Sequence, residues 1–300
     1  MLEYKPIIQK ISSDLFSEKE IEVSVLRLDL IHPEISGNKW FKLKYNLEEA
    51  KKQGLYTILT FGGAFSNHIH AAAVSCKEFG FKSIGVIRGE KESESNSTLS
   101  EAKKYGMQLH FVSREKYKQK ESKEFVEQLK KQFGNFYLIP EGGDNSFGEK
   151  GCEEILSKEN NFDHIFCACG TGTTFKGISK SLKPNQKLIG ISVLKGEPFG
   201  KLRMTEKDSE IITDYHFGGY AKHTNELLEF KNKFESENNI PLDHVYTSKL
   251  FYAVTDLISK NKIPKNSKVL IIHSGGLQGN AGYEKRYFLK PNLNVKEPQG

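Results

Sequence analysis

Residues 36–42 are Ser36-Gly37-Asn38-Lys39-Trp40-Phe41-Lys42, and they join a predicted strand at residues 21–30 to a predicted helix at residues 41–53. Glycine and asparagine relax the backbone at this turn and bring Lys39 to a strand-to-helix junction. A lysine there is a nucleophile when its surroundings lower its pKa from the reference value of about 10.4. The order of strand, loop and helix recurs along the chain, so this stretch begins a series.

The recurring units predict an α/β fold with a mostly parallel sheet covered by helices on both faces. Predicted strands lie at residues 21–30, 56–61, 83–88, 108–112, 136–139, 164–169, 187–194, 242–246 and 268–273. Predicted helices lie at residues 41–53, 71–79, 98–105, 115–133, 147–156, 225–238 and 247–260. Ligands bind at the carboxyl ends of parallel strands, so loops that follow strands are expected to meet in one cleft. Those loops carry Lys39, Ser66-Asn67, Gly170-Thr171-Gly172-Thr173-Thr174, Thr247 and Ser274.

Composition excludes several functional classes. The chain has 300 residues, 27% of them charged, and a net charge of +6 that is spread over mixed Lys and Glu segments. This distribution favours solvated helix faces over a nucleic-acid surface. No apolar run approaches a membrane span, and the first residues show no signal-peptide pattern. The cysteines lack the paired spacing of a zinc site, so we expect no metal, buried thiols and a cytoplasmic location. They are Cys76, Cys152, Cys167 and Cys169.

The segment Gly170-Thr171-Gly172-Thr173-Thr174, here called the threonine loop, is the strongest local signal. Its backbone N–H groups and hydroxyl groups, between a strand and a helix, suit an anion. A nucleotide-binding P-loop would need lysine where Ile178 stands, and a dinucleotide fingerprint would need glycine where Phe175 stands. A phosphate monoester site is therefore favoured over those two sites and over a tight turn without a ligand.

Three other segments each allow two interpretations. Ser66-Asn67-His68 follows two glycines and can cap a helix, or can hold a carboxylate or a phenolic oxygen. Tyr220 can be a packed aromatic residue or a catalytic one. Ser274-Gly275-Gly276 allows close backbone approach to a ligand, or is an ordinary strand exit.

Taken together, these segments resemble the fold-type II pyridoxal-phosphate enzymes, in particular the group of D-cysteine desulfhydrase and 1-aminocyclopropane-1-carboxylate (ACC) deaminase. The resemblance spans nearly the whole chain and rests on six motifs in the right order. They are Gly37-Asn38-Lys39 with Lys42-Leu43, Ser66-Asn67-His68, Ile139-Pro140 with Gly142-Gly143, the threonine loop, Val245-Tyr246-Thr247 with Lys249, and Ile272-His273-Ser274-Gly275-Gly276.

The resemblance implies pyridoxal 5′-phosphate as the cofactor. Lys39 would bond covalently to its aldehyde and later act as the base that takes the substrate α-proton. Asn67 would hydrogen-bond the ring hydroxyl, and the threonine loop, from Gly170 to Thr174, would hold the phosphate. Thr247 and Ser274 would lie near the ring nitrogen.

The same resemblance implies a small amino acid as the substrate and indicates which residues would contact it. Ser66, Asn67 and His68 would meet its carboxylate. Tyr220 would line the substrate pocket, and Tyr246 would lie beside it. Ser66, Tyr220 and Tyr246 are, with Lys39, the implied catalytic residues.

The family's deaminases carry a glutamate after the tyrosine that matches Tyr246, whereas this chain has Thr247. A neutral hydroxyl keeps the ring nitrogen protonated less well than an anion does, so the cofactor would be a weaker electron sink. That difference favours loss of a good leaving group. The expected reaction is α,β-elimination of D-cysteine to pyruvate, ammonia and sulfide. The alternatives are ACC deaminase activity, giving 2-oxobutyrate and ammonia, and a non-catalytic phosphometabolite-binding protein on the same scaffold.

The resemblance also implies a tryptophan synthase β-like architecture of two domains. Residues 1–42 and 144–300 would form a large cofactor-binding domain, and residues 43–143 a small inserted α/β domain. A homodimer is implied by the family alone. Three positions depart from the family pattern, which usually has Arg, Glu and Arg in place of Phe41, Lys44 and His70.

Overall fold

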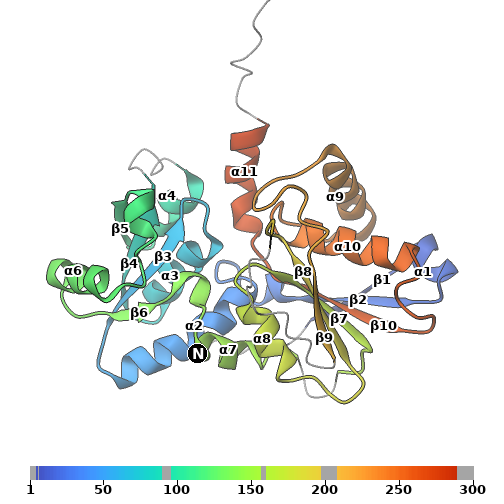
Figure 1. Cartoon of the computed structure of the whole chain (residues 1–300), viewed down its shortest axis with the longest axis horizontal. Helices are drawn as coiled ribbons and strands as arrows, with labels where there is room; N and C mark the ends of the chain where they lie inside the picture. Colours follow the sequence, from blue (N-terminus) through green and yellow to red (C-terminus); the bar gives the residue numbers. More distant parts are fainter. Residues whose placement is uncertain (1–4, 6, 90–95, 157–159, 197–207, 289–300) are drawn as a thin grey trace, which may run out of the picture.

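The computed structural model describes residues 5, 7–89, 96–156, 160–196 and 208–288, and within them it shows two β-sheets side by side (Figure 1). The larger sheet has the strand order β1-β2-β10-β7-β8-β9, and the smaller has the order β5-β4-β3-β6. In the part of the chain that the structure describes, all strand pairs are parallel except β1 with β2, which is antiparallel at one edge. The predicted architecture of mostly parallel sheets is therefore confirmed.

Both faces of the larger sheet are covered by helices. Its strands are β1 (Ile8–Ile11), β2 (Glu22–Arg27), β7 (His164–Cys169), β8 (Lys187–Ser192), β9 (Ser209–Ile212) and β10 (Lys268–His273). One face packs on α1 (Asp14–Glu18), α9 (Asn225–Asn238) and α10 (Thr247–Ser259). The other packs on α7 (Ser146–Cys152), α8 (Thr173–Ser179) and the start of α2 (Asn38–Lys52). Such two-sided burial explains the near-continuous apolar sequence of the central strands.

The smaller sheet is also covered on both faces. Its strands are β3 (Thr57–Gly63), β4 (Lys82–Arg88), β5 (Gln108–Val112) and β6 (Tyr137–Ile139). One face packs on α2, α3 (Asn67–Glu78) and α4 (Ser97–Lys104), and the other on α5 (Arg114–Tyr117) and α6 (Lys123–Phe133). Helix α11 (Asn280–Tyr287) stands between the two halves (Figure 1). Among the described residues, no helix is long and apolar enough to span a bilayer.

Several predicted elements differ from the structure. The predicted helix at residues 115–133 is two helices, α5 and α6, because the Ser122 hydroxyl accepts the Phe125 N–H at 3.2 Å and starts a new helix. The predicted strand at residues 242–246 is wrong, since the Asp243 carboxylate closes a turn there by accepting N–H groups of Val245, Tyr246 and Thr247. Strand β1 and helix α1 were not predicted.

The two sheets are built from different parts of the chain. Strands of the smaller sheet fall within residues 57–139, and strands of the larger sheet come from both flanks. The predicted boundary at residues 42 and 43 lies inside α2, which runs from one half to the other (Figure 1). The boundary itself stays a prediction. All four cysteines are buried free thiols.

Candidate active site

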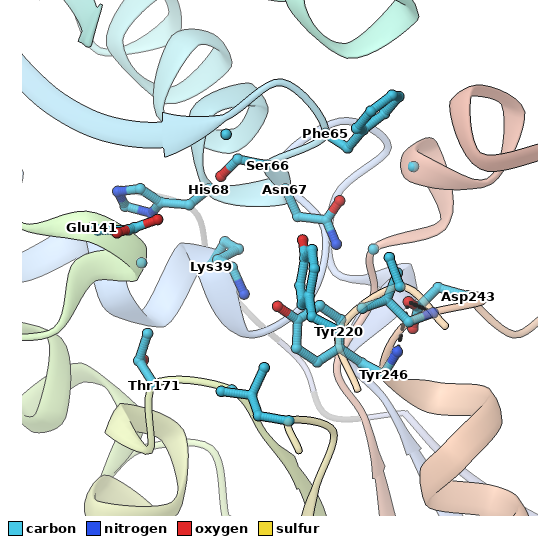
Figure 2. Close-up of a pocket in the computed structure, with 18 of the residues that line it drawn as sticks. Lys39, Phe65, Ser66, Asn67, His68, Glu141, Thr171, Tyr220, Asp243 and Tyr246 are labelled. Carbon is cyan, nitrogen blue, oxygen red and sulfur yellow. Dashed lines mark hydrogen bonds between the residues drawn. The ribbon is translucent and has the colours of Figure 1, made fainter. Parts of the chain in front are cut away.

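A large cavity lies between the two sheets, and residues of both line it (Figure 2). Its volume is about 1240 Å³, and the loops after β3, β4, β7 and β10 reach it, as expected for the carboxyl ends of parallel strands. Most of the predicted site residues line this cavity, while Thr173 and Thr247 do not. Those on its wall are Lys39, Ser66, Asn67, His68, Gly170, Thr171, Gly172, Thr174, Tyr220, Tyr246 and Ser274.

Lys39 is the second residue of α2, and its side chain points into the cavity (Figure 2). Its Nζ donates a hydrogen bond to Asn38 Oδ1 at 2.7 Å and lies 6.0 Å from the centroid of the Tyr246 ring. Burial, followed by the nearby charge of Lys42, lowers the pKa of Lys39 to about 7. A large share of the amine is therefore neutral at neutral pH, as a nucleophile or a general base requires.

The backbone before Lys39 is fixed by contact with the end of β10. Gly37 has φ of +76°, and a Cβ there would stand 1.9 Å from the carbonyl oxygen of Ser274. The Asn38 N–H donates to the same oxygen at 3.2 Å. Only glycine allows this approach and this dihedral angle, so the larger sheet sets the position of Lys39.

The threonine loop lies beside the start of α2. The Asn38 Nδ2 group donates to the Thr174 hydroxyl at 2.8 Å, which joins the loop to the residue before Lys39. Thr173 is fully buried, and its hydroxyl donates to Asp144 at 2.7 Å. The loop therefore offers Thr171, Thr174 and its backbone N–H groups to a ligand, and the prediction that Thr173 also faces the ligand is not supported.

Lys42 also lies in the site, although the sequence indicates it only as part of the Lys42-Leu43 motif. It is 4% exposed, lies one helical turn after Lys39 and lines the same cavity. Burial lowers its pKa, although nearby Asp144 acts in the opposite direction. The i, i+3 spacing on α2 was the available signal, because it places Lys39 and Lys42 on one helix face.

Ser66 caps α3, which begins at Asn67 and forms the opposite wall (Figure 2). The Ser66 hydroxyl accepts the Ile69 N–H at 3.3 Å, so the helix-cap interpretation is confirmed. The first N–H groups of a helix lack intrahelical partners, and here they start at the cavity wall. This end of α3 therefore suits a carboxylate.

His68 is 2% exposed, and hydrogen bonds fix its tautomer. The Thr60 hydroxyl donates to the Ile139 carbonyl at 2.8 Å, so it must accept at 2.9 Å from His68 Nε2, which carries the proton. Nδ1 has no hydrogen-bond partner among the described residues. Burial and the charges of Lys39 and Lys42 lower the pKa of His68 to about 3. His68 is therefore a neutral acceptor and brings no positive charge to a carboxylate.

Tyr220 and Tyr246 lie together on the wall next to Lys39 (Figure 2). Their rings meet edge to face, with centroids 6.2 Å apart and planes at 73°. Burial raises the pKa of Tyr246 well above its usual value. It also raises the pKa of Tyr220, so both hydroxyl groups stay protonated at neutral pH.

Thr247 is fully buried, and its hydroxyl bonds within its own turn. It donates to Asp243 Oδ1 at 2.8 Å and accepts the Asp243 N–H at 2.7 Å. The structure thus does not place Thr247 on the cavity wall, where Asp243, Tyr246 and Ser274 stand instead. Asp243 escaped the sequence analysis because its segment reads as a strand.

A comparison with known families agrees with this geometry. The family described as "Pyridoxal-phosphate dependent enzyme" matches residues 11–275. The chain belongs to this family. Its members share the tryptophan synthase β-like fold that the sequence predicted, with two mostly parallel sheets flanked by helices.

Comparison with individual relatives indicates to which group within this family the chain belongs. A Thermotoga maritima protein named "Putative 1-aminocyclopropane-1-carboxylate deaminase" is 33% identical, over 93% of this chain and 96% of the relative. An Arabidopsis thaliana mitochondrial protein named as a bifunctional D-cysteine desulfhydrase/ACC deaminase is 31% identical, over 86% of this chain and 73% of the relative. A crystal structure described as an ACC deaminase homologue matches with a TM-score of 0.79 and 29% identity, covering 93% and 91% of the two chains. The chain is therefore a pyridoxal-phosphate enzyme of the ACC deaminase and D-cysteine desulfhydrase group.

The cavity has the groups that pyridoxal phosphate needs. Lys39 supplies an amine with a lowered pKa for the aldehyde. The threonine loop supplies N–H groups and hydroxyl groups for the phosphate, and the buried amine of Lys42 lines the same cavity. Asn67 and Ser274 line the same cavity and can meet the polar edge of the ring.

Proposed function

We propose that this enzyme catalyses α,β-elimination of a small β-substituted amino acid, with D-cysteine as the substrate. One D-cysteine and one water would give pyruvate, ammonia and hydrogen sulfide. The observation that carries the proposal is the Lys39 amine, whose pKa burial lowers to about 7, facing a cavity with an anion cradle at one end. Such an amine takes a proton at neutral pH without prior deprotonation by another base.

The chain's own residues have separate tasks in this reaction. Bound pyridoxal phosphate would supply the electron-withdrawing ring. Lys39 would take the α-proton, while the start of α3 with Ser66 would hold the substrate carboxylate. The carbon–sulfur bond would break with its electron pair on sulfur, and the protonated hydroxyl groups of Tyr220 and Tyr246 are suited to donate hydrogen bonds there.

The preference for elimination over ring opening rests on the environment of residue 247. The glutamate that the family's deaminases are expected to carry is a threonine here, and its hydroxyl is committed to Asp243. The Asp243 carboxylate itself accepts from three backbone N–H groups and this hydroxyl. No carboxylate at this position is thus free to pair with a ring nitrogen, which supports a weaker electron sink and an easily released sulfur.

ACC deaminase activity is the second candidate, because the names of the Thermotoga and Arabidopsis relatives include it. The earlier alternative of a non-catalytic phosphometabolite-binding protein loses support, since the matching family consists of enzymes. The homodimer and the cytoplasmic location remain predictions.

A substrate assay tests the proposal. Purified protein is incubated with D-cysteine, L-cysteine or ACC, and sulfide, pyruvate and 2-oxobutyrate are measured. We expect sulfide and pyruvate in equal amounts from D-cysteine, and none with Lys39→Ala. Borohydride reduction followed by mass spectrometry should locate the cofactor on Lys39. Release of 2-oxobutyrate without sulfide would favour the second candidate, and no product from any substrate would reject both.

A further inference from the structure

Tyr220 sits on a backbone segment in which several residues have left-handed backbone angles. We call residues 213–224, between β9 and α9, the Tyr220 loop. Within it, Phe217 and Ala221 have φ of 50° and 53°, in the left-handed region that disfavours side chains, and two glycines between them also have positive φ. A loop of this kind keeps its shape only when surrounding groups hold it.

Besides the hydrogen bonds within the loop, one buried side chain from outside it bonds to its backbone. The Nζ of Lys249 donates to the carbonyl of His216 at 2.9 Å and to the carbonyl of Gly219 at 2.7 Å. These two carbonyls lie at either end of the left-handed turn, and the second belongs to the residue before Tyr220. Lys249 is fully buried on α10. Hydrogen bonds from a buried ammonium group are stronger than those between neutral groups, so they are well suited to hold a strained turn.

Helix α10 links this contact to the reacting groups. Tyr246 lies directly before α10 and packs edge to face on Tyr220, and Lys249 follows one turn later. Residues three apart lie on the same helix face, so α10 holds Tyr220 from two sides, at its ring and at its backbone. We propose that Lys249 is a positioning residue that fixes the Tyr220 hydroxyl for the substrate, an inference that rests on the proposed function of this cavity.

The charge state of Lys249 is compatible with this role. Burial lowers the pKa of Lys249 to about 8, and Asp243 acts in the opposite direction. Most molecules therefore carry the ammonium charge at pH 7. Its hydrogen-bond acceptors are two carbonyl oxygens, so loss of the side chain would remove one hydrogen bond from each of two loop carbonyls.

The test compares Lys249→Met, which removes the donors, with Lys249→Gln, whose amide keeps two. Lys231→Met is the matched control, because Lys231 is another buried lysine but pairs with Glu235 on α9. In the holoenzyme, hydrogen–deuterium exchange is followed at the loop amides of Gly219 and Lys222, which bond inside the turn. We expect them to exchange at least about tenfold faster in Lys249→Met than in the parent, and to be unchanged in the control.

Kinetics provide the second readout. We expect kcat/KM for D-cysteine to fall by about tenfold to a hundredfold in Lys249→Met, with the cofactor content unchanged and Lys249→Gln in between. In a Tyr220→Phe background, Lys249→Met should lower kcat/KM little further, because Lys249 acts through the Tyr220 hydroxyl, which that background lacks. Parent-like loop exchange, or losses that simply add, would overturn the inference.

The two readouts separate this inference from the proposed function. If the parent enzyme turns over no amino acid, the proposed reaction is wrong, while faster loop exchange in Lys249→Met would still show that Lys249 holds the loop. If Lys249→Met does not fold, the Lys249→Gln variant decides by the same exchange measurement. An unchanged loop in that variant together with full activity would count against the role of charge.

Discussion

Lys39 should make the cofactor-free protein less stable, and Lys39→Met should reverse this. Burial lowers the pKa of Lys39 to about 7 in the folded chain, whereas the unfolded chain has the reference value of about 10.4. At pH 7 this difference corresponds to a loss on the order of 4 kcal/mol in the free energy of unfolding, at about 1.36 kcal/mol per pKa unit. The figure is an upper bound, because the Lys39 side chain keeps some contact with solvent.

The sign of the pH dependence follows from proton binding. Between pH 7 and pH 10.4 the unfolded chain binds more protons than the folded chain, so the stability of the parent rises with pH. The penalty is full below pH 7, falls to about 2 kcal/mol at pH 9 and vanishes above the unfolded pKa. Methionine has a similar length and no charge, so the advantage of Lys39→Met should shrink over the same range.

Urea unfolding of both cofactor-free proteins at pH 7 and pH 9 measures this difference. Lys51→Met is the matched control, since Lys51 is an exposed lysine near the end of the same helix. It should change the free energy of unfolding by no more than about 0.5 kcal/mol at either pH. A Lys39→Met gain that is equal at both pH values would show that ionisation is not its cause, and a loss of stability would refute the reasoning.

Three further outcomes are expected. Gly37→Ala should lose at least about 3 kcal/mol of stability in urea unfolding, because its Cβ would stand 1.9 Å from the Ser274 oxygen. Gly54→Ala is the control: Gly54 also has a positive φ but has open space around it, so this variant should lose about 1 kcal/mol. Asp243→Ala should cost about 3 kcal/mol in the same assay, since it removes the acceptor of four hydrogen bonds. The rate at which the cofactor attaches to Lys39 can be measured by absorbance after pyridoxal phosphate is added to the cofactor-free protein. This rate should increase about tenfold per pH unit below pH 7 and level off above it. A rate that still rises at pH 9 would contradict the lowered pKa.

The sequence predicted several elements with the bounds that the structure shows. The strands at residues 108–112, 164–169 and 268–273 and the helix at residues 225–238 have the predicted bounds. The strands at residues 164–169 and 268–273 are almost fully buried, and their apolar sequence reflects this burial. The break between α5 and α6 was missed because charged helix-forming residues run through it, although Ser122 is a good cap. Strand β1 was missed because it is a short edge strand with three of its four residues at least partly exposed.

The sequence predicts which loops meet at the site, but it does not predict which hydrogen bonds their side chains form. Loops after parallel strands meet at one edge, so Lys39, Ser66 and Ser274 were expected in one cavity and lie there. The role of Thr247 depends on which partner its hydroxyl finds, and that partner is the Asp243 carboxylate four residues earlier. Residue type and spacing do not show whether such a side chain faces a ligand or forms a local hydrogen bond.

The site residues are divided between the two sheets: the larger sheet carries the amine and the anion cradle, and the smaller sheet carries Ser66. Lys39 is tied to the larger sheet through the Ser274 carbonyl, and the threonine loop through the Asn38 side chain. The amine and the anion cradle are therefore both tied to the larger sheet, while the rest of α2 packs on the smaller one. Ser66, at the start of α3, follows β3 and belongs to the smaller sheet. A change in the angle between the sheets would therefore alter the distance from Ser66 to Lys39, and Asn67 would move together with Ser66. We expect closure of the cleft on a substrate to bring Ser66 and Asn67 toward the Lys39 amine.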